Sequence, residues 1–441
     1  MALKITVIGT GYLGATHAAA MAELGFEVLG LDVVPEKIAL LAQGRVPMYE
    51  PGLEELLARH VAGIEGSSGR LRFTTSWEEA GAFGDVHFVC VNTPQKHGEY
   101  ACDMSYVDSA FASLAPHLRE GALVVGKSTV PVGSAARLAA TLPEGVELAW
   151  NPEFLREGFA VNDTLHPDRI VVGVESERAE KLLREVYGTP VAEGSPFVVT
   201  DFPTAELVKT SANSFLATKI SFINAMAEVC EAADGDVVKL AEAIGHDERI
   251  GSKFLRAGIG FGGGCLPKDI RAFMARAGEL GADQALTFLR EIDSINMRRR
   301  GQMVEMAREA LGGGSFLGKR VAVLGATFKP DSDDVRDSPA LNVAGQIHLQ
   351  GGQVTVYDPK GMDNARRLFP TLGYADTALD AVRGADVVLH LTEWREFREL
   401  DPAALGEVAD ARIVLDGRNA LDAVKWREAG WTFRAMGRPR A

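Results

Sequence analysis

The chain has 441 residues, of which 46% are hydrophobic and 24% are charged. This is an ordinary globular composition, which excludes a chain that is disordered throughout. At about 150 residues per domain, the length suggests roughly three domains. The 60 acidic residues outnumber the 46 Lys and Arg residues, so the net charge is −14. Nucleic acids and anionic membranes are therefore not expected as main partners.

The four cysteines, Cys90, Cys102, Cys230 and Cys265, are far apart and form no CxxC pair. This spacing predicts no metal site and no disulfide framework, and it favours a reducing compartment such as the cytoplasm. The N-terminal sequence MALKITVIGTGYLG lacks the basic and long apolar regions of a signal peptide. No apolar run approaches the roughly 18 residues that a membrane-spanning helix needs.

In the first 200 residues, β-rich runs alternate with helical patterns. The patterns predict strands at 4–8, 27–31, 86–91 and 123–126, and a helix over 15–24. Strands that alternate with helices indicate βαβ units and a doubly wound parallel sheet. We therefore expect an α/β fold, with a Rossmann-like domain over residues 1–200.

Residues 9–14 read GTGYLG, a GxGxxG motif between the first strand and the first helix. Gly9 permits a tight turn, Gly11 lets the backbone approach a pyrophosphate, and Gly14 allows close packing of helix on strand. Asp32 ends the second strand, where its carboxylate would bind a ribose 2′-hydroxyl and repel a 2′-phosphate. The motif therefore predicts NAD rather than NADP, the alternative being a turn that merely needs glycines.

Apolar residues recur at helical spacing from Pro203 to Ala233. A helix of about 28 residues would span roughly 40 Å. Its apolar residues lie on more than one face, which suits burial between domains or at a dimer interface. We therefore expect residues 201–312 to form a helical dimerisation region in a homodimer.

A second α/β pattern follows, and it predicts strands at 320–324, 353–357, 387–391 and 413–415. We expect residues 313–441 to form a second Rossmann-like domain. Its turn, residues 325–329, reads GATFK and lacks the second and third glycines, so an NAD pyrophosphate would fit poorly. Lys329 either holds a different phosphate or belongs to a purely structural domain.

Three groups of residues suggest chemistry. The segment GIGFGGGCLPKD places Cys265 after five glycines, which indicates either an exposed nucleophile flanked by Lys268 and Asp269 or a small core residue. Lys209 and Asn213 are four residues apart on the long helix, where they either stabilise an oxyanion or are an ordinary solvated pair.

The third group lies in the segment NPEFLREG, where Glu153 and Glu157 would converge if the segment were helical. One of them could then act as a general base for water, the alternative being an exposed acidic turn. Together the groups suggest oxidation of a primary alcohol to an acid. NAD accepts hydride, a cysteine captures the aldehyde as a thiohemiacetal, a second NAD yields a thioester, and water releases the acid.

The chain resembles the UDP-glucose/GDP-mannose dehydrogenase family. The resemblance lies in GTGYLG, VNTP, STVPVG, NPEFLREG, ELVKTSANSFLATKISFINAMAEVCE, GFGGGCLPKD, FKPDSDDVRDSP and LDGRN. It implies an NAD-binding domain, a long helix at a dimer interface, and a Rossmann-like domain for the nucleotide sugar. It also implies NAD-dependent, four-electron oxidation of UDP-glucose to UDP-glucuronate.

By the same resemblance, Cys265 is the nucleophile, and Glu153 handles the hydrolytic water. The other residues implied in catalysis are Lys209, Asn213, Asp269 and Thr129. Residues implied to contact NAD are Gly9, Gly11, Tyr12, Leu13, Gly14, Asp32, Lys37, Thr93, Thr129, Glu157 and Arg336. Residues implied to contact the substrate are Glu153, Leu155, Lys209, Asn213, Phe254, Arg256, Gly262, Phe328, Lys329 and Arg418, with Arg249 reaching the neighbouring subunit's substrate.

The sequence departs from the family pattern at Gln95, Arg256 and Gly264, where Thr, Lys and Ser are frequent. Three alternatives remain at this stage. The same chemistry could act on GDP-mannose or UDP-N-acetylmannosamine. The chain could be a non-catalytic nucleotide-sugar sensor. It could also be a 3-hydroxyacid or 6-phosphogluconate-type dehydrogenase, which performs one hydride transfer without a thiol.

Overall fold

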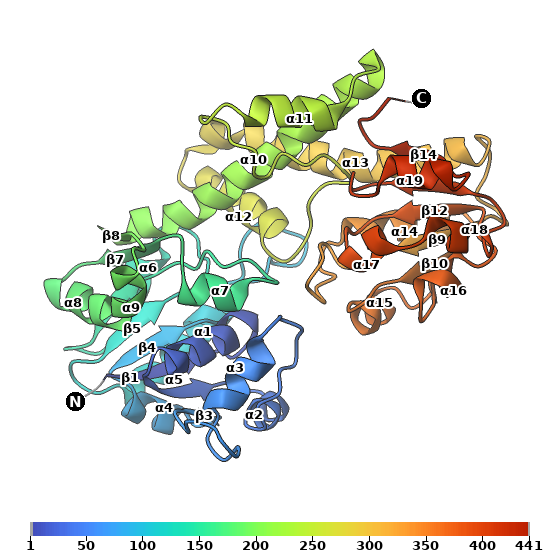
Figure 1. The fold of residues 1–441 in the computed structure, drawn as a ribbon. Helices are drawn as coiled ribbons and strands as arrows, with labels where there is room; N and C mark the ends of the chain where they lie inside the picture. Colours follow the sequence, from blue (N-terminus) through green and yellow to red (C-terminus); the bar gives the residue numbers. More distant parts are fainter. Residues whose placement is uncertain (1–2, 440–441) are drawn as a thin grey trace. The chain divides into compact units, whose positions relative to one another are not determined.

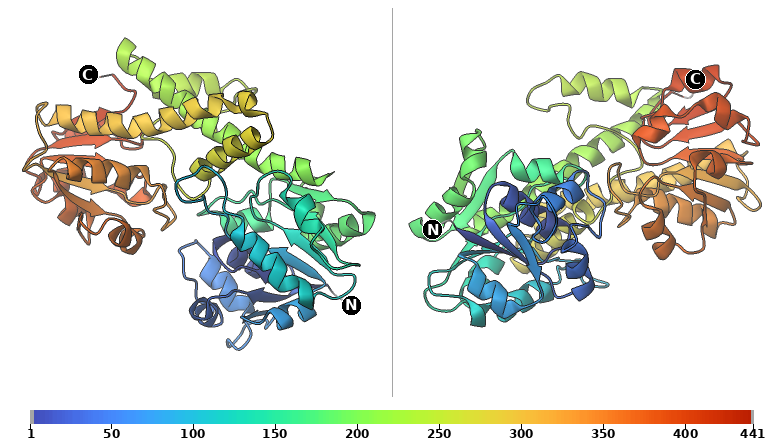
Figure 2. Two further views of the ribbon diagram at one scale, coloured as in Figure 1. Left: turned by 180° about the vertical axis from the view of Figure 1, so that it is seen from behind. Right: turned by 60° about the horizontal axis from the view of Figure 1, so that its bottom comes forward.

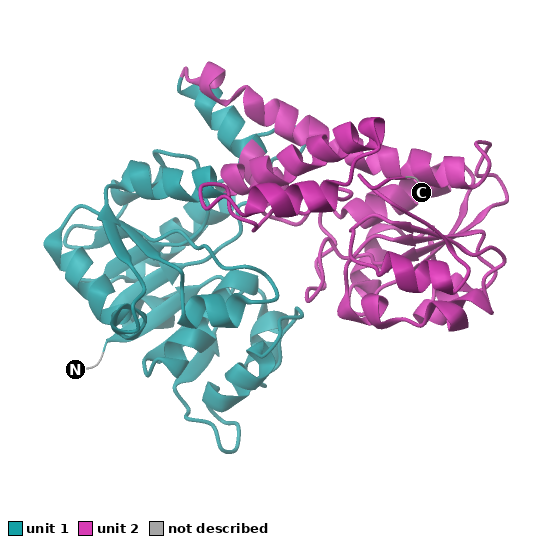
Figure 3. Cartoon of the chain, turned by 45° about the horizontal axis from the view of Figure 1, so that its top comes forward, with its two compact units in different colours: residues 1–212, 271–280 teal, residues 213–270, 281–441 magenta. Residues whose placement is uncertain are grey.

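The structure, a computed structural model, describes residues 3–439. They divide into two compact units (Figure 3). Unit 1 contains the chain up to residue 212 together with residues 271–280, and unit 2 contains residues 213–270 and the chain from residue 281 onward. Each unit is built on its own β-sheet.

Unit 1 has an eight-stranded sheet in the order β3-β2-β1-β4-β5-β6-β7-β8 (Figure 1). The strands are β1 (Lys4–Ile8), β2 (Glu27–Leu31), β3 (Leu71–Thr74), β4 (Val86–Val89), β5 (Leu123–Gly126), β6 (Glu147–Trp150), β7 (Ile170–Val174) and β8 (Phe197–Thr200). The first six follow the Rossmann order. All neighbours are parallel except β6 and β7, which pair antiparallel.

Helices cover both faces of this sheet, as the views of Figure 2 show. Side chains alternate between two cores along β1, so that Ile5 and Val7 face one core and Ile8 faces the other. This alternation gives the sheet an apolar surface on each face. Helices α1, α3 and α8 pack on the first face, and α5 and α6 pack on the second. The helices are α1 (Tyr12–Glu23), α2 (Pro35–Leu41), α3 (Leu53–His60), α4 (Trp77–Phe83), α5 (Ser105–Leu114), α6 (Ser134–Ala139), α7 (Ala160–Leu165), α8 (Glu177–Val186) and α9 (Gly188–Ala192), with a 3-10 turn at Ala115–His117.

The middle of the chain is helical. Helix α10 (Phe202–Ala233) is 32 residues long and is followed by α11 (Val237–Gly245), α12 (Leu266–Glu279), a 3-10 turn at Asp283–Leu286 and α13 (Phe288–Ala310). Asp236 begins α11 by accepting the N–H groups of Val238 and Lys239, which fixes where the helix starts after α10 ends. The long central helix expected from the apolar spacing is therefore confirmed.

Unit 2 has a six-stranded parallel sheet in the order β11-β10-β9-β12-β13-β14, again the Rossmann order. Its strands are β9 (Arg320–Leu324), β10 (Gln353–Tyr357), β11 (Gly373–Tyr374), β12 (Val387–His390), β13 (Ile413–Asp416) and β14 (Thr432–Ala435). Helices α13 and α14 pack on one face, and α16 to α19 pack on the other. The remaining helices are α14 (Pro339–Leu349), α15 (Met362–Leu368), α16 (Ala378–Val382), α17 (Arg395–Glu399), α18 (Pro402–Gly406) and α19 (Ala423–Glu428).

The predicted α/β fold with two Rossmann-like domains is confirmed. Strands β1, β2, β5, β9 and β10 have the predicted bounds, whereas β4 ends two residues early and α1 begins at Tyr12 instead of Ala15. The antiparallel β7 departs from the expected parallel sheet, because a strand's residue pattern does not report its direction. None of the helices within residues 3–439 is long and apolar enough to cross a membrane.

Candidate active site

The glycine turn between β1 and α1 is closed at its first and third glycines and open at its second. Gly9 has a positive φ of 84°, and a Cβ on Gly14 would lie 1.8 Å from the Gly9 carbonyl oxygen. A Cβ on Gly11 would meet nothing nearer than Asn92, at 4.0 Å. Helix α1 starts at Tyr12 without a side-chain cap, so its first N–H groups can bind an anion. This geometry fits a dinucleotide pyrophosphate.

Asp32 lies at the end of β2, beside this turn. Its Oδ2 accepts the N–H of Thr10 at 2.9 Å and the Lys37 ammonium at 2.7 Å, and its Oδ1 accepts the N–H of Val34 at 3.2 Å. Burial alone would raise the pKa of Asp32, but the bonds from Lys37, Thr10 and Val34 outweigh it and lower the pKa below its ordinary value. The carboxylate is therefore ionised at neutral pH.

Unit 1 gathers its other predicted residues at the same edge of the sheet. The glycine turn, Thr93, Thr129 and Glu153 follow β1, β4, β5 and β6, which are neighbours in the sheet. Carboxyl ends of parallel strands meet at one edge, which is where ligands bind in Rossmann sheets. Thr93 is buried and Thr129 is half-buried.

The Glu153 carboxylate is fixed by three contacts. Its Oε1 accepts the N–H groups of Phe154 at 2.7 Å and Leu155 at 3.0 Å, and its Oε2 lies 3.0 Å from Nζ of Lys127. Residues 151–156 form no helix, so the condition for Glu153 and Glu157 to converge on a helix face is not met. Sequence reasoning missed Lys127, although it directly precedes the STVPVG motif.

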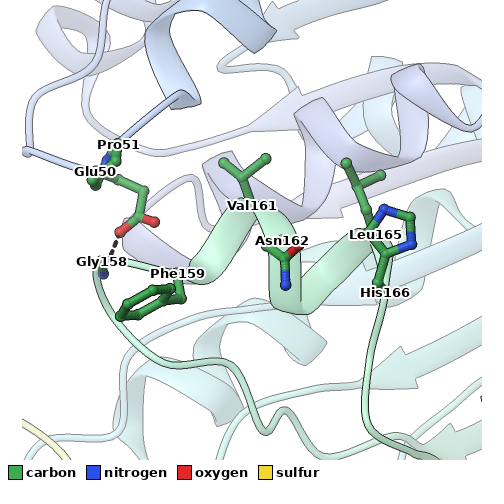
Figure 4. Close-up of a pocket in the computed structure, with 8 residues that line it drawn as sticks. All are labelled: Glu50, Pro51, Gly158, Phe159, Val161, Asn162, Leu165 and His166. Atoms are coloured by element: carbon green, nitrogen blue, oxygen red, sulfur yellow. Dashed lines mark hydrogen bonds between the residues drawn. The ribbon is translucent and has the colours of Figure 1, made fainter.

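A second buried carboxylate ties the glycine turn to the segment that carries Glu157. Glu50 accepts the N–H of Gly158 at 2.7 Å (Figure 4). It also accepts the N–H of Ala160 at 2.7 Å and the hydroxyl of Tyr12. An open pocket of about 300 Å³ lies beside it, lined by Glu50, Pro51, Gly158, Phe159, Val161, Asn162, Leu165 and His166. None of the predicted site residues lines this pocket. Glu50 was also missed, since nothing in the sequence links it to a partner 108 residues away.

Lys209 lies in the part of α10 that belongs to unit 1. It is half-buried, and its Nζ lies 5.6 Å from the centre of the Phe154 ring. One turn earlier, the buried Glu206 accepts the N–H groups of Gly133 and Ala135 at 2.7 Å each. These two bonds attach helix α10 to the start of α6, which follows the loop that carries Thr129.

In unit 2, Cys265 is exposed, whereas Cys90, Cys102 and Cys230 are buried. Cys265 directly precedes α12, and its carbonyl oxygen accepts the N–H of Asp269 at 2.9 Å. The N–H groups and dipole at a helix start stabilise negative charge, which suits a thiolate nucleophile.

The polar residues predicted around Cys265 within unit 2 lie together. The Asn213 amide donates to Asp269 Oδ2 at 2.6 Å, and the Lys268 ammonium lies 2.6 Å from Asp269 Oδ1. Asn213 and Asp269 are buried. A Cβ on Gly264 would lie 2.3 Å from Cζ of Arg336, so the Arg336 guanidinium covers the backbone next to Cys265. A serine at this position would require the end of the Arg336 side chain to move.

The glycine-rich loop before Cys265, residues 258–264, also contacts the second Rossmann-like domain. The Arg418 guanidinium donates to the carbonyl oxygens of Leu391 and Gly260 at 2.8 Å and to that of Phe328 at 3.2 Å. A Cβ on Gly263 would lie 2.8 Å from the Phe328 ring. Three predicted substrate residues, Gly262, Phe328 and Arg418, are thus adjacent in unit 2.

The other predicted residues of unit 2 are more exposed. Phe254 has a φ of 65° and is 39% exposed, and Arg256 lies 3.9 Å from Glu393. Lys329 Nζ lies 5.5 Å from the centre of the Phe328 ring. The Arg249 side chain is 88% exposed and pairs with Asp247, a neighbour in sequence. Leu155, by contrast, belongs to unit 1.

No metal site is formed by the described residues: among 3–439, no three or more His, Cys, Asp or Glu side chains are grouped to hold an ion.

Known proteins of similar sequence and structure agree with a dinucleotide turn in unit 1 and a second Rossmann sheet in unit 2. A UDP-glucose 6-dehydrogenase of Rhizobium meliloti is 40% identical over 444 residues, covering 99% of this chain and 100% of the relative. A UDP-glucose dehydrogenase structure from Pyrobaculum islandicum matches with a TM-score of 0.88 and 37% identity, covering 98% of each chain. A UDP-D-ManNAc dehydrogenase structure from Pyrococcus horikoshii matches with a TM-score of 0.86 and 27% identity, covering 100% of each chain.

The family domains follow one another along the sequence. Residues 3–191 match an NAD binding domain, residues 203–298 a central domain and residues 322–423 a UDP binding domain. All three domains are those of one family. The chain therefore belongs to the UDP-glucose/GDP-mannose dehydrogenase family.

Proposed function

We propose that this protein oxidises UDP-glucose to UDP-glucuronate with two NAD⁺ per sugar. The observation that carries the proposal is the exposed Cys265 at the start of α12, close to the buried Asn213–Asp269 pair. A single oxidation of an alcohol needs no thiol. The second oxidation needs a tetrahedral carbon from which a hydride can leave, and addition of the Cys265 thiol to the aldehyde would supply one as a thiohemiacetal.

The residues take successive roles in this scheme. The glycine turn and Asp32 would hold NAD⁺, which would supply the hydride acceptor for each oxidation. Lys209 and Asn213 stabilise negative charge on the sugar oxygen as its hydroxyl proton is lost to water. The Cys265 thiolate adds to the aldehyde carbon and later leaves when water cleaves the thioester. Glu153 accepts the proton of that water.

UDP-glucose is favoured over the other nucleotide sugars by two features. The curated relative at 40% identity is a UDP-glucose enzyme, while the UDP-D-ManNAc enzyme structure is 27% identical.

A non-catalytic sensor would have no need to keep Cys265, Lys209, Asn213 and Asp269 together. The second Rossmann-like domain likewise argues against the 3-hydroxyacid and 6-phosphogluconate-type dehydrogenases.

The stoichiometry tests the proposal. With limiting UDP-glucose and excess NAD⁺, we expect two NADH and one UDP-glucuronate per sugar, measured by absorbance and chromatography. One NADH per sugar with an aldehyde or ketone product would contradict the double oxidation. Turnover of GDP-mannose or UDP-N-acetylmannosamine in place of UDP-glucose would contradict the substrate alone.

We also propose that Asp32 makes the enzyme prefer NAD over NADP. A fixed carboxylate repels a 2′-phosphate, and such a like-charge contact is worth several kcal/mol. We expect kcat/KM with NADP to be about 100-fold or more below that with NAD. Asp32→Ala should narrow the gap about tenfold or more, whereas Glu36→Ala, which removes a nearby exposed acid, should not. Equal efficiency of the wild type with both cofactors would refute this role.

We further propose a homodimer formed through α10. Phe215, Phe222 and Val229 are 66%, 47% and 57% exposed in the single chain, and they recur every seven residues along one face of the helix. Sedimentation at micromolar concentration should give twice the 47.2 kDa of one chain. Phe222→Asp should shift the protein to monomer, and Leu349→Asp, at an 86% exposed position on α14, should not. A wild-type monomer would contradict the dimer.

We also propose a division of the chain at residues 200 and 312, which the strand and helix patterns of the sequence support. The family resemblance supports the site roles named above and the proposal that Arg249 reaches the substrate of a neighbouring subunit. The wide spacing of the four cysteines, with no CxxC pair, supports a reducing, cytoplasmic location that cell fractionation can check.

A further inference from the structure

Lys127 is a lysine that the scheme above does not use, yet it is buried in unit 1. Its side chain is 4% exposed and follows β5 directly. Nζ lies 2.9 Å from Oδ1 of Asn151, 3.0 Å from Oε2 of Glu153 and 3.4 Å from the Tyr187 hydroxyl. A buried ammonium is strongly destabilising unless a carboxylate compensates it. Lys127 therefore needs Glu153.

The charge balance around Lys127 is simple. Burial raises the pKa of both Cys90 and Tyr187 to about 12, and burial lowers the pKa of His17 well below its ordinary value. These three groups, from the position after β4, the α8–α9 junction and α1, are neutral at pH 7. Two further cations, Arg169 and Lys209, lie over the Phe154 ring. Among the charged groups that raise the pKa of Lys127, Glu153 has the largest effect.

The pair is also held rigidly from both sides. Asn151 donates to the Val171 carbonyl oxygen at 2.8 Å, while its Oδ1 accepts from Tyr187 at 2.5 Å and from Lys127. Burial alone would lower the pKa of Lys127, but the charges of Glu153, Tyr187 and Cys90 and the hydrogen bond to Glu153 outweigh it, so the pKa lies above its ordinary value. Lys127 is therefore a cation at neutral pH.

We propose that Lys127 is a positioning residue for the hydrolytic step: it holds the Glu153 carboxylate in the orientation in which it can accept a proton from water. This rests on the proposed function. Water adds to the thioester carbon on Cys265, its proton passes to Glu153, and the carbon–sulfur bond breaks to release the acid and the thiolate. Lys127 touches neither substrate nor water, and it acts through Glu153.

Single-turnover kinetics with UDP-glucose and NAD⁺ test the proposal. Lys127→Met should leave the rate of first NADH formation within about threefold of wild type, because in the proposed scheme Glu153 accepts a proton only from the hydrolytic water. Without the ammonium, the Glu153 carboxylate is no longer held in one orientation. Thioester hydrolysis should therefore be about tenfold or more slower.

Two controls separate this role from structural support. Lys127→Arg keeps the charge and should bring thioester hydrolysis back to within about threefold of wild type. Tyr187→Phe perturbs the same buried cluster without removing the cation, and it should also leave hydrolysis within about threefold of wild type. A Lys127→Met enzyme in which first NADH formation and thioester hydrolysis slow by the same factor would overturn the proposal.

Thermal melting keeps the test decisive if Lys127→Met folds poorly or UDP-glucose is not the substrate. Glu153→Gln leaves the buried cation uncompensated and should lower Tm. Adding Lys127→Met to Glu153→Gln should then restore part of that loss. Additive losses of Tm would overturn the pairing. A wild type that forms no NADH from UDP-glucose refutes the proposed function, while the melting data still decide on Lys127.

Discussion

A buried carboxylate at the end of the second strand organises both Rossmann sheets. Asp32 accepts from the backbone and hydroxyl of Thr10, and Asp358 accepts in the same way from the N–H groups of Ala326 and Thr327 and from the Thr327 hydroxyl. Each carboxylate thereby fixes the turn that leaves the first strand. The position of that turn decides where a helix begins and where a ligand can approach the sheet.

The two carboxylates differ in what surrounds them. Oδ2 of Asp358 also accepts from Trp394, and its Oδ1 accepts from Lys360 and Gly361, so both oxygens are committed to the protein. Asp32 lies beside a turn that is open at Gly11, whereas the matching turn in unit 2 has side chains at Ala326 and Thr327. The same scaffold thus supports a dinucleotide site in unit 1 and a different use in unit 2.

The site shows which features a sequence can reveal. The glycine turn, the exposed Cys265 and the long helix carry local signals, namely backbone conformation and apolar spacing, and these were predictable. Lys127 and Glu50 carry no such signal, because an isolated Lys or Glu in a sequence is usually solvated. Their burial arises from pairing across β5 and β6 and between segments 108 residues apart. The antiparallel β7 was missed for the same reason, since pairing direction is a tertiary property.

The proposed double oxidation requires a covalent bond between Cys265 and the sugar. The most direct measurement is peptide mass spectrometry of Glu153→Gln after acid quench of a reaction with UDP-glucose and NAD⁺. We expect the peptide carrying Cys265 to gain the mass of one UDP-glucuronyl group, and we expect this gain to disappear when Cys265→Ser is added. An unmodified Cys265 peptide in an enzyme that still forms two NADH per sugar would contradict it.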